Sequence, residues 1–142
     1  MKIAYSDEDL LIVEKPPGLA DPAAELSRSH PEILKVGGRD RGACHRLDTG
    51  TSGLMVFARN EETYLKMREL FSKNKIKKEY LALVVGEVRE GGRVDGPIGP
   101  DPKSKRRVKV YWNVKVGRKN KAQEAVSIYE PVGAPLGAPQ RR

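Results

Sequence analysis

Asp48 is the residue whose position best suits chemistry. It follows an apolar residue in a glycine-punctuated stretch, HRLDTGTSG, which ends directly before a run of apolar residues. A carboxylate in such a loop can be held rigidly while it faces a cleft, and the neighbouring histidine, arginine, threonine and serine side chains supply hydrogen-bond donors. The alternative is a structural aspartate that accepts hydrogen bonds from nearby backbone amides, as turn aspartates often do.

The rest of the sequence excludes or disfavours several kinds of active site. No second carboxylate stands in the motif, so a glycosidase with two carboxylates is not favoured. The chain has no GxxxxGK[ST] or GxGxxG pattern, which argues against a nucleotide-cradling loop. One cysteine and two histidines argue against a metal enzyme and exclude a disulfide framework. We expect Cys44 to be a small packed residue rather than a nucleophile.

The charge of the chain indicates an acidic partner. Its 142 residues include 27 Lys and Arg against 19 Asp and Glu, which gives a net charge of +8. A basic domain suits a polyanion such as nucleic acid, although many domains with this excess bind none. Hydrophobic residues make up 38% of the chain, enough for the core of one domain. With no membrane-length apolar run and no signal-peptide pattern, we expect a soluble cytoplasmic protein.

Short elements on either side of the motif must position Asp48. After it, residues 54–58 are typical of a buried strand. Asn60 is a candidate N-cap, and the apolar residues that follow would share one face of a helix over 61–73. The elements predicted before the motif are strands at 3–5 and 10–13 and a short helix at 22–26.

The second half of the sequence predicts further strands. Residues 79–85 are apolar on both alternating faces, which predicts a central strand covered on both sides. Glycine–proline pairs predict a long loop over 89–107. Alternation over 108–116 predicts a strand with its valines and tryptophan on one apolar face, and 125–129 as its antiparallel return. Residues 132–142 are rich in proline and glycine, which predicts an irregular tail.

The segment HRLDTGTSGLMVFAR resembles the catalytic motif of the RluA-type family of RNA pseudouridine synthases. Three further segments are similar to the same family. DEDLLIVEKPPGL is similar to its first strand and Lys-Pro-x-Gly turn, and KKEYLALVVGEV to its Lys-x-Tyr strand. GPIGPDPKSKRRVKV and QEAVSIYEPV are similar to its next loop and hairpin. Together the four segments extend over residues 3–131.

The resemblance implies an enzyme that isomerises uridine in RNA with one essential aspartate and no metal or cofactor. Asp48 matches that aspartate, which acts either as a nucleophile or as a proton acceptor. Arg46 matches the arginine that displaces and holds the flipped nucleotide, and Tyr80 matches the tyrosine that packs against the uracil ring. A core aromatic is the alternative for Tyr80. The cations expected to contact the RNA backbone are Lys15, Lys78, Lys105, Arg106 and Arg107.

The resemblance also implies an α+β fold, with a mixed, mainly antiparallel sheet and few helices. Residues 1–131 would form part of the catalytic domain, and 132–142 the irregular tail. The family's next element is similar to Gly-Arg-x-His-Gln-Ile-Arg and carries an arginine that pairs with the aspartate; no such segment occurs here. Asp48 would lack that partner, and strand 79–85 would lose part of its cover. We therefore expect a homo-oligomer, a partner chain covering the open sheet, or marginal stability.

Three hypotheses about function follow. The first is an RNA pseudouridine synthase, active alone or with a partner chain. The second is a non-catalytic RNA-binding remnant that keeps the basic surface, and the third is a structural fragment with neither role. Ribosomal and transfer RNA are both open as substrates, because the choice of substrate depends on the shape of the surface.

Overall fold

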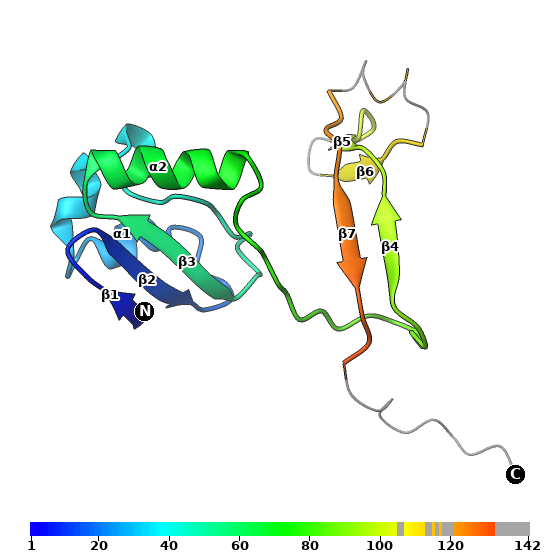
Figure 1. Ribbon diagram of the computed structural model, residues 1–142, viewed down its shortest axis with the longest axis horizontal. Helices are drawn as coiled ribbons and strands as arrows, with labels where there is room; N and C mark the ends of the chain where they lie inside the picture. The colour runs from blue at the N-terminus through cyan, green and yellow to red at the C-terminus, as the bar shows by residue number, and fades with distance from the viewer. Residues whose placement is uncertain (105–106, 113–114, 116, 118–120, 133–142) are drawn as a thin grey trace, which may run out of the picture. The chain divides into compact units, whose positions relative to one another are not determined.

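A computed structural model of the chain describes residues 1–104, 107–112, 115, 117 and 121–132 (Figure 1). The chain forms two compact units, residues 1–80 and residues 81–142. The first unit combines an antiparallel sheet with helices, and the described strands of the second unit are also antiparallel. The predicted α+β class, with a mainly antiparallel sheet and few helices, is confirmed.

The sheet of the first unit has three antiparallel strands in the order β1-β2-β3. They are β1 (Lys2–Ser6), β2 (Leu10–Lys15) and β3 (Gly53–Ala58). The strands predicted at 3–5 and 10–13 are thus present, and they pair as an antiparallel hairpin. The outer edge of β3 is occupied by the segment that precedes the motif. There the Cys44 amide donates to the Val56 carbonyl at 2.9 Å, and the Ala58 amide donates to the Gly42 carbonyl at 2.8 Å.

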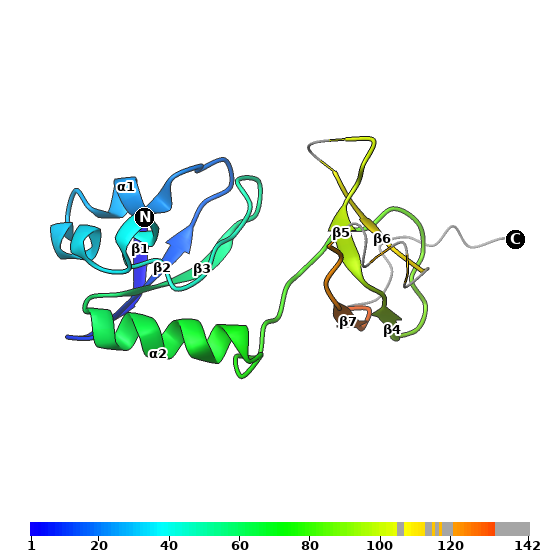
Figure 2. The same ribbon diagram turned by 90° about the horizontal axis from the view of Figure 1, so that it is seen from above.

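Helices cover both faces of this sheet (Figure 2). Helix α1 (Pro22–Leu26) lies on one face and helix α2 (Glu61–Ser72) on the other, while η1 (Pro31–Lys35) and η2 (Gly38–Asp40) are short 3-10 turns. Asn60 caps α2 as predicted, accepting the Thr63 amide at 2.9 Å. Of the helices in the described part of the chain, none has the length and apolar character that a bilayer crossing requires.

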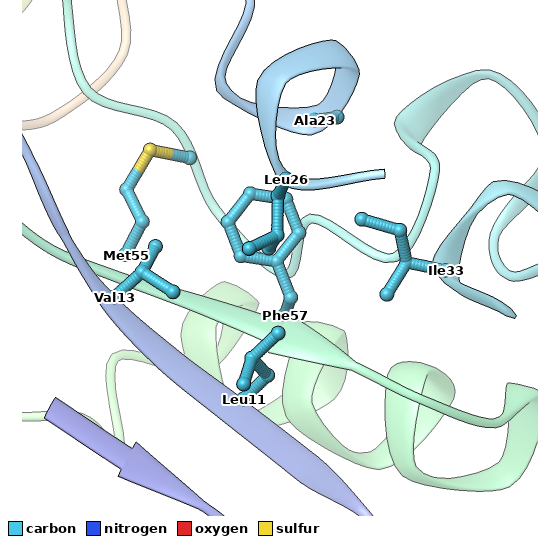
Figure 3. Close-up of a cluster of buried hydrophobic side chains, with 7 residues drawn as sticks. All are labelled: Leu11, Val13, Ala23, Leu26, Ile33, Met55 and Phe57. Carbon is cyan, nitrogen blue, oxygen red and sulfur yellow. The ribbon is translucent and has the colours of Figure 1, made fainter. Parts of the chain in front are cut away.

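Two apolar clusters, one on each face, hold the helices to the sheet. In the first cluster, Leu26 of α1 lies beside the ring of Phe57 (Figure 3). Its members are Leu11, Val13, Ala23, Leu26, Ile33, Met55 and Phe57. The second cluster lies beneath α2 and contains Val36, Cys44, Ala58 and Tyr64. Alternate residues of β2 and β3 therefore contribute to the core, as the period of two in a strand requires.

The second unit contains two short strand pairs that differ from the prediction. Strand β4 (Gly92–Asp95) pairs with β7 (Val126–Tyr129), and β5 (Ile98–Pro100) pairs with β6 (Val108–Val110). The expected continuous loop over 89–107 is wrong, because β4 and β5 form within it. The expected pairing of 125–129 with 108–116 is also wrong, because β7 forms its ladder with β4.

The face predicted for the strand at 108–116 is reversed at its end. Tyr111 is buried, and its hydroxyl donates to the Pro100 carbonyl. Trp112, expected on the apolar face, is 74% exposed. The strand ends at Val110, so the alternation that the sequence suggested does not continue past it. Residues 113–114, 116 and the tail from 133 onward lie outside the described residues.

The predicted central strand at 79–85 is wrong in the described structure. These residues connect the two units and belong to no strand. Leu81, Leu83 and Val85 are exposed by 88%, 101% and 105%. A strand needs a neighbour for its backbone groups, and no backbone hydrogen bond reaches these residues from the described part of the chain. The edge of β3 is already occupied by the segment before the motif.

We predict that chymotrypsin cuts within residues 80–83 before it cuts at the buried aromatic residues of the first unit. An exposed segment without backbone hydrogen bonds opens at almost no free-energy cost, whereas Phe57 and Tyr64 become accessible only when the core opens. Mass spectrometry of early digestion products should therefore show fragments ending at Tyr80, Leu81 or Leu83. First cuts at Phe57 or Tyr64 would contradict the exposed connection.

Candidate active site

The motif segment is anchored to β3 through His45. The Nε2 atom of His45 accepts the backbone N–H of Val56 at 3.2 Å, and its ring lies 4.6 Å from the ring of Phe71 on α2. Two residues later, Leu47 packs against the first apolar cluster. These two side chains turn toward the protein, which fixes the backbone that carries the residues between and after them.

Arg46 and Asp48 alternate with the anchoring residues and are exposed. Neither side chain makes a hydrogen bond or ion pair with any residue that the structure describes. A guanidinium and a carboxylate therefore project from one short, fixed segment, both available to a ligand.

Arg46 borders a small hollow beside α1. The hollow has a volume of about 220 Å³ and is lined by residues of α1, η2, β3 and the motif. Its carboxylates are engaged: Asp21 binds the Arg41 guanidinium at 2.7 and 2.8 Å, and Asp40 accepts the Tyr64 hydroxyl. The Tyr64 hydroxyl is neutral, so Asp40 keeps its negative charge. The rim therefore carries three guanidiniums, those of Arg39, Arg41 and Arg46, against two carboxylates, which is a small positive excess.

Asp48 begins a tight turn whose carbonyl groups point to a buried lysine. The Thr51 amide donates to the Asp48 carbonyl at 3.0 Å, which closes the turn. Lys15 is 2% exposed, and its Nζ lies within 3.1 Å of the carbonyls of Pro16, Asp48, Thr49 and Thr51. The expectation that Lys15 contacts RNA phosphate is wrong, because its ammonium is buried and its donors are used internally.

The structure brings Lys78 near the motif, whereas none of the described contacts joins Tyr80 to it. Lys78 is exposed, and its charge acts on the His45 ring. Tyr80 is 63% exposed and outside any strand; no described hydrogen bond or ring contact joins it to Arg46 or Asp48. Arg107 is exposed in the turn between β5 and β6 of the second unit. Lys105 and Arg106 lie outside the described residues.

Burial controls the titration of the two residues that precede Arg46. Removal of the His45 ring from water lowers its pKa, and the nearby Lys78 charge lowers it further. Burial raises the pKa of the Cys44 thiol to about 11. Cys44 is fully buried, which confirms the packed residue expected from the sequence. Among the described residues, no cluster of three or more His, Cys, Asp or Glu side chains could hold a metal ion.

Comparison with known proteins identifies the fold and the family. A family model described as RNA pseudouridylate synthase matches residues 9–134, which include the motif and most of each unit. The chain belongs to the RNA pseudouridylate synthase family. The resemblance that the motif suggested is thus confirmed over most of the sequence.

Curated relatives of this family are longer than the chain. The chain is 33% identical over 128 residues to the ribosomal large subunit pseudouridine synthase D of Nitrosomonas europaea, covering 83% of the chain and 37% of that protein. It is 35% identical over 103 residues to the tRNA pseudouridine synthase C of Haemophilus ducreyi, covering 69% and 42%. The chain therefore spans less than half the length of these relatives.

A solved structure shows the same fold. The human RNA pseudouridylate synthase domain containing 1 superposes with a TM-score of 0.70 at 22% identity, covering 89% of this chain and 50% of that one. At this level of identity the similarity concerns the fold. It supports the α+β assignment made from the strands and helices above.

Sequence reasoning missed the internal role of Lys15, although a signal was present. Leu11, Val13 and Lys15 have the spacing of one strand face, and the first two are apolar. When a lysine at the end of a strand has the same spacing as the buried residues of that strand, its side chain points into the protein. Its ammonium then needs acceptors such as backbone carbonyls. The residues that follow Lys15, Pro-Pro-Gly, indicated the start of a turn and not a buried side chain.

We predict that His45 makes the stability of the first unit fall in mild acid. Because the pKa of His45 is lowered in the fold, the unfolded chain binds a proton first as the pH drops below about 6.5. The stability contributed by the neutral ring is full above that pH and is lost as the pH falls through the folded pKa. Urea unfolding between pH 7.5 and pH 5 should show this loss.

His45→Gln provides the control, because its amide oxygen can accept the Val56 N–H without titrating. That variant should unfold with little pH dependence over the same range. His45→Leu leaves the N–H without an acceptor, so it should cost about 1 kcal/mol or more at pH 7.5. An unchanged pH dependence in His45→Gln would show that His45 is not the titrating group.

Proposed function

We propose that this chain isomerises uridine to pseudouridine in RNA, alone or with a partner chain, and that Asp48 is the catalytic group. The supporting observation is the state of its carboxylate, which is exposed and unpaired among the described residues while its backbone is held in a closed turn. Such a carboxylate can approach an extruded nucleoside without first breaking an internal contact.

The reaction suits a single acidic group. The bond between N1 of uracil and C1′ of ribose breaks, the base turns, and a bond forms between C5 and C1′. C5 releases its proton and N1 gains one, so the net change consumes no water and no second substrate. Asp48 either attacks C1′ and is later displaced by C5, or accepts a proton from the sugar. Water must be kept from the cleaved sugar in both cases.

RNA binding in this proposal combines a flipped base with contacts to phosphate. Extrusion of a nucleotide costs a few kcal/mol, which a side chain entering the vacated space offsets. Arg46 is proposed for this position, because it is exposed, unpaired and next to Asp48 in the chain. Tyr80 is proposed to pack against uracil. The cations proposed to contact phosphate are Lys78, Lys105, Arg106 and Arg107.

The proposed substrate is a structured cytoplasmic RNA, either ribosomal or transfer RNA. The relatives quoted above are named for one or the other of these substrates. We place residues 1–131 in the catalytic domain and residues 132–142 outside it. No metal or cofactor enters the proposed reaction, because one carboxylate and the uracil itself account for each bond that changes.

We predict that Asp48→Asn lowers isomerisation by about 10²-fold to 10⁴-fold or more, since the amide can neither attack C1′ nor accept the proton. The measurement is release of tritium from RNA labelled at C5 of uridine. Glu8→Gln is the matched control, because Glu8 is exposed and unpaired in the described structure. Equal release by wild type and Asp48→Asn would remove Asp48 from the reaction.

A non-catalytic RNA-binding remnant is the second candidate. It is favoured by one observation: Tyr80, proposed to pack against uracil, is exposed, lies outside any strand and has no described contact with Arg46 or Asp48. Salt-dependent RNA binding without tritium release, unchanged in Asp48→Asn, is the result expected from a remnant. Release that appears only when a second polypeptide is added is the result expected from an enzyme completed by a partner.

We further propose that the segment 80–85 is covered by a second copy or by a partner chain. Its exposed apolar side chains, and backbone groups that no described residue pairs, make it suitable for addition to another sheet. Covering it would remove the largest apolar side chains of the connection from water.

We predict that the wild-type chain self-associates and that Leu83→Lys weakens this association about tenfold or more, because a buried leucine contributes about 1.5–3 kcal/mol. Sedimentation over a range of concentrations measures the effect. Leu65→Lys is the control, since Leu65 is also exposed but lies on α2. A wild-type chain that remains monomeric and melts at high temperature would contradict the self-association.

A further inference from the structure

We propose that Lys15 is a positioning residue, whose buried ammonium holds the turn Asp48–Thr51 in the conformation that presents Asp48. Three of the four carbonyls in contact with its Nζ belong to this turn: those of Asp48, Thr49 and Thr51, at 3.1, 3.0 and 2.8 Å. The inference rests on the proposed function only in assigning the reaction to Asp48. The contact itself can be tested without activity.

The strand register places the ammonium beneath the turn. Lys15 is the last residue of β2 and pairs with Gly53, the first residue of β3. It lies on the same strand face as Leu11 and Val13, and like them it is buried. Its aliphatic stem therefore continues the apolar face of β2, while Nζ emerges where the sheet ends and the turn begins.

The carbonyl groups that converge on Nζ are stabilised by its positive charge. Each carbonyl oxygen carries partial negative charge, so several of them directed at one point repel one another. An ammonium has three N–H donors and no acceptor, and it meets four acceptors here, so at least one N–H is shared between two oxygens. The lysine thus does what a bound monovalent cation would do at such a site, but it is covalently attached.

The fourth carbonyl and a neighbouring glycine join a second segment to the turn. Nζ also contacts the Pro16 carbonyl at 3.1 Å, and the Gly18 amide donates to the Thr49 carbonyl at 2.7 Å. Gly18 has φ of +85°, a conformation that favours glycine. The Lys-Pro-Pro-Gly stretch and the Asp48 turn are therefore held together at a buried charge.

The consequences of this arrangement differ from those of a phosphate contact. Removal of the ammonium should loosen the turn and lower the rate of isomerisation while leaving RNA affinity and its salt dependence unchanged. Removal of a phosphate contact should weaken RNA binding and reduce the slope of log affinity against log salt concentration by about 0.7 for a single strand.

The first experiment compares Lys15→Met with Lys2→Met in the full chain. Lys2 is the control because it is an exposed lysine of the neighbouring strand β1, and its ammonium pairs with the Glu14 carboxylate and not with the turn. In Lys15→Met the amides of Gly18 and Thr51, which depend on the turn, should exchange with solvent about tenfold faster or more. Exchange in Lys2→Met should match the wild type. Unchanged exchange of Gly18 and Thr51 in Lys15→Met would overturn the proposal.

Measurements of RNA binding and of turnover distinguish a positioning role of Lys15 from a direct contact with phosphate. For Lys15→Met we expect the wild-type salt slope, a lower kcat for tritium release and an unchanged half-saturating RNA concentration. A salt slope reduced by about 0.7 would instead make Lys15 a phosphate ligand. If Asp48→Asn leaves tritium release unchanged, the proposed function fails while the exchange result still decides the role of Lys15.

Chemical rescue covers the case in which Lys15→Met does not fold. Lys15→Ala removes the stem from Cγ to Nζ, a fragment that propylammonium resembles. Added propylammonium should restore the fold and the slow exchange of Gly18 and Thr51. Tetramethylammonium at the same ionic strength should not, because it has no N–H to donate. Equal restoration by both salts, or by neither, would overturn the proposal.

Discussion

The pairing of β2 with β3 is the constraint on which the first unit depends. It sets Leu10 opposite Ala58 and Lys15 opposite Gly53, and so decides which side chains enter the core. A shift of one residue would turn every side chain of β2 to the other face of the sheet. Leu11 and Val13 would leave the apolar cluster, and Lys15 would leave the turn carbonyls. The core and the candidate site thus depend on the same register.

The elements with strong local signals could be predicted from the sequence. Asn60 marks the start of α2, Pro22 the start of α1, and the apolar run before Arg59 is β3. Each of these depends on residues close together in the chain. Arg46 and Asp48 are exposed in the structure, and their roles at a ligand belong to the proposed function.

The second half was predicted less well, because its structure depends on which distant segments pair with one another, and residues close together in the sequence do not show this. Alternation identifies the faces of a strand but not the strand that pairs with it, so β7 was assigned to the wrong ladder. The apolar residues of 79–85 indicate burial without showing what covers them, and the described chain leaves them exposed. The role of Lys15 was predicted wrongly for a related reason. Its charge suggested that the side chain is exposed to solvent, whereas its position in β2 places it on the buried face of the strand.

The hydrogen bond from the Val56 amide to Nε2 of His45 fixes more than the position of the ring. A nitrogen that accepts this bond carries no proton, so the neutral imidazole holds its hydrogen on Nδ1. That tautomer cannot exchange protons through Nε2 without releasing the strand. Although His45 stands three residues before Asp48, its Nε2 atom is therefore committed to holding the motif on β3.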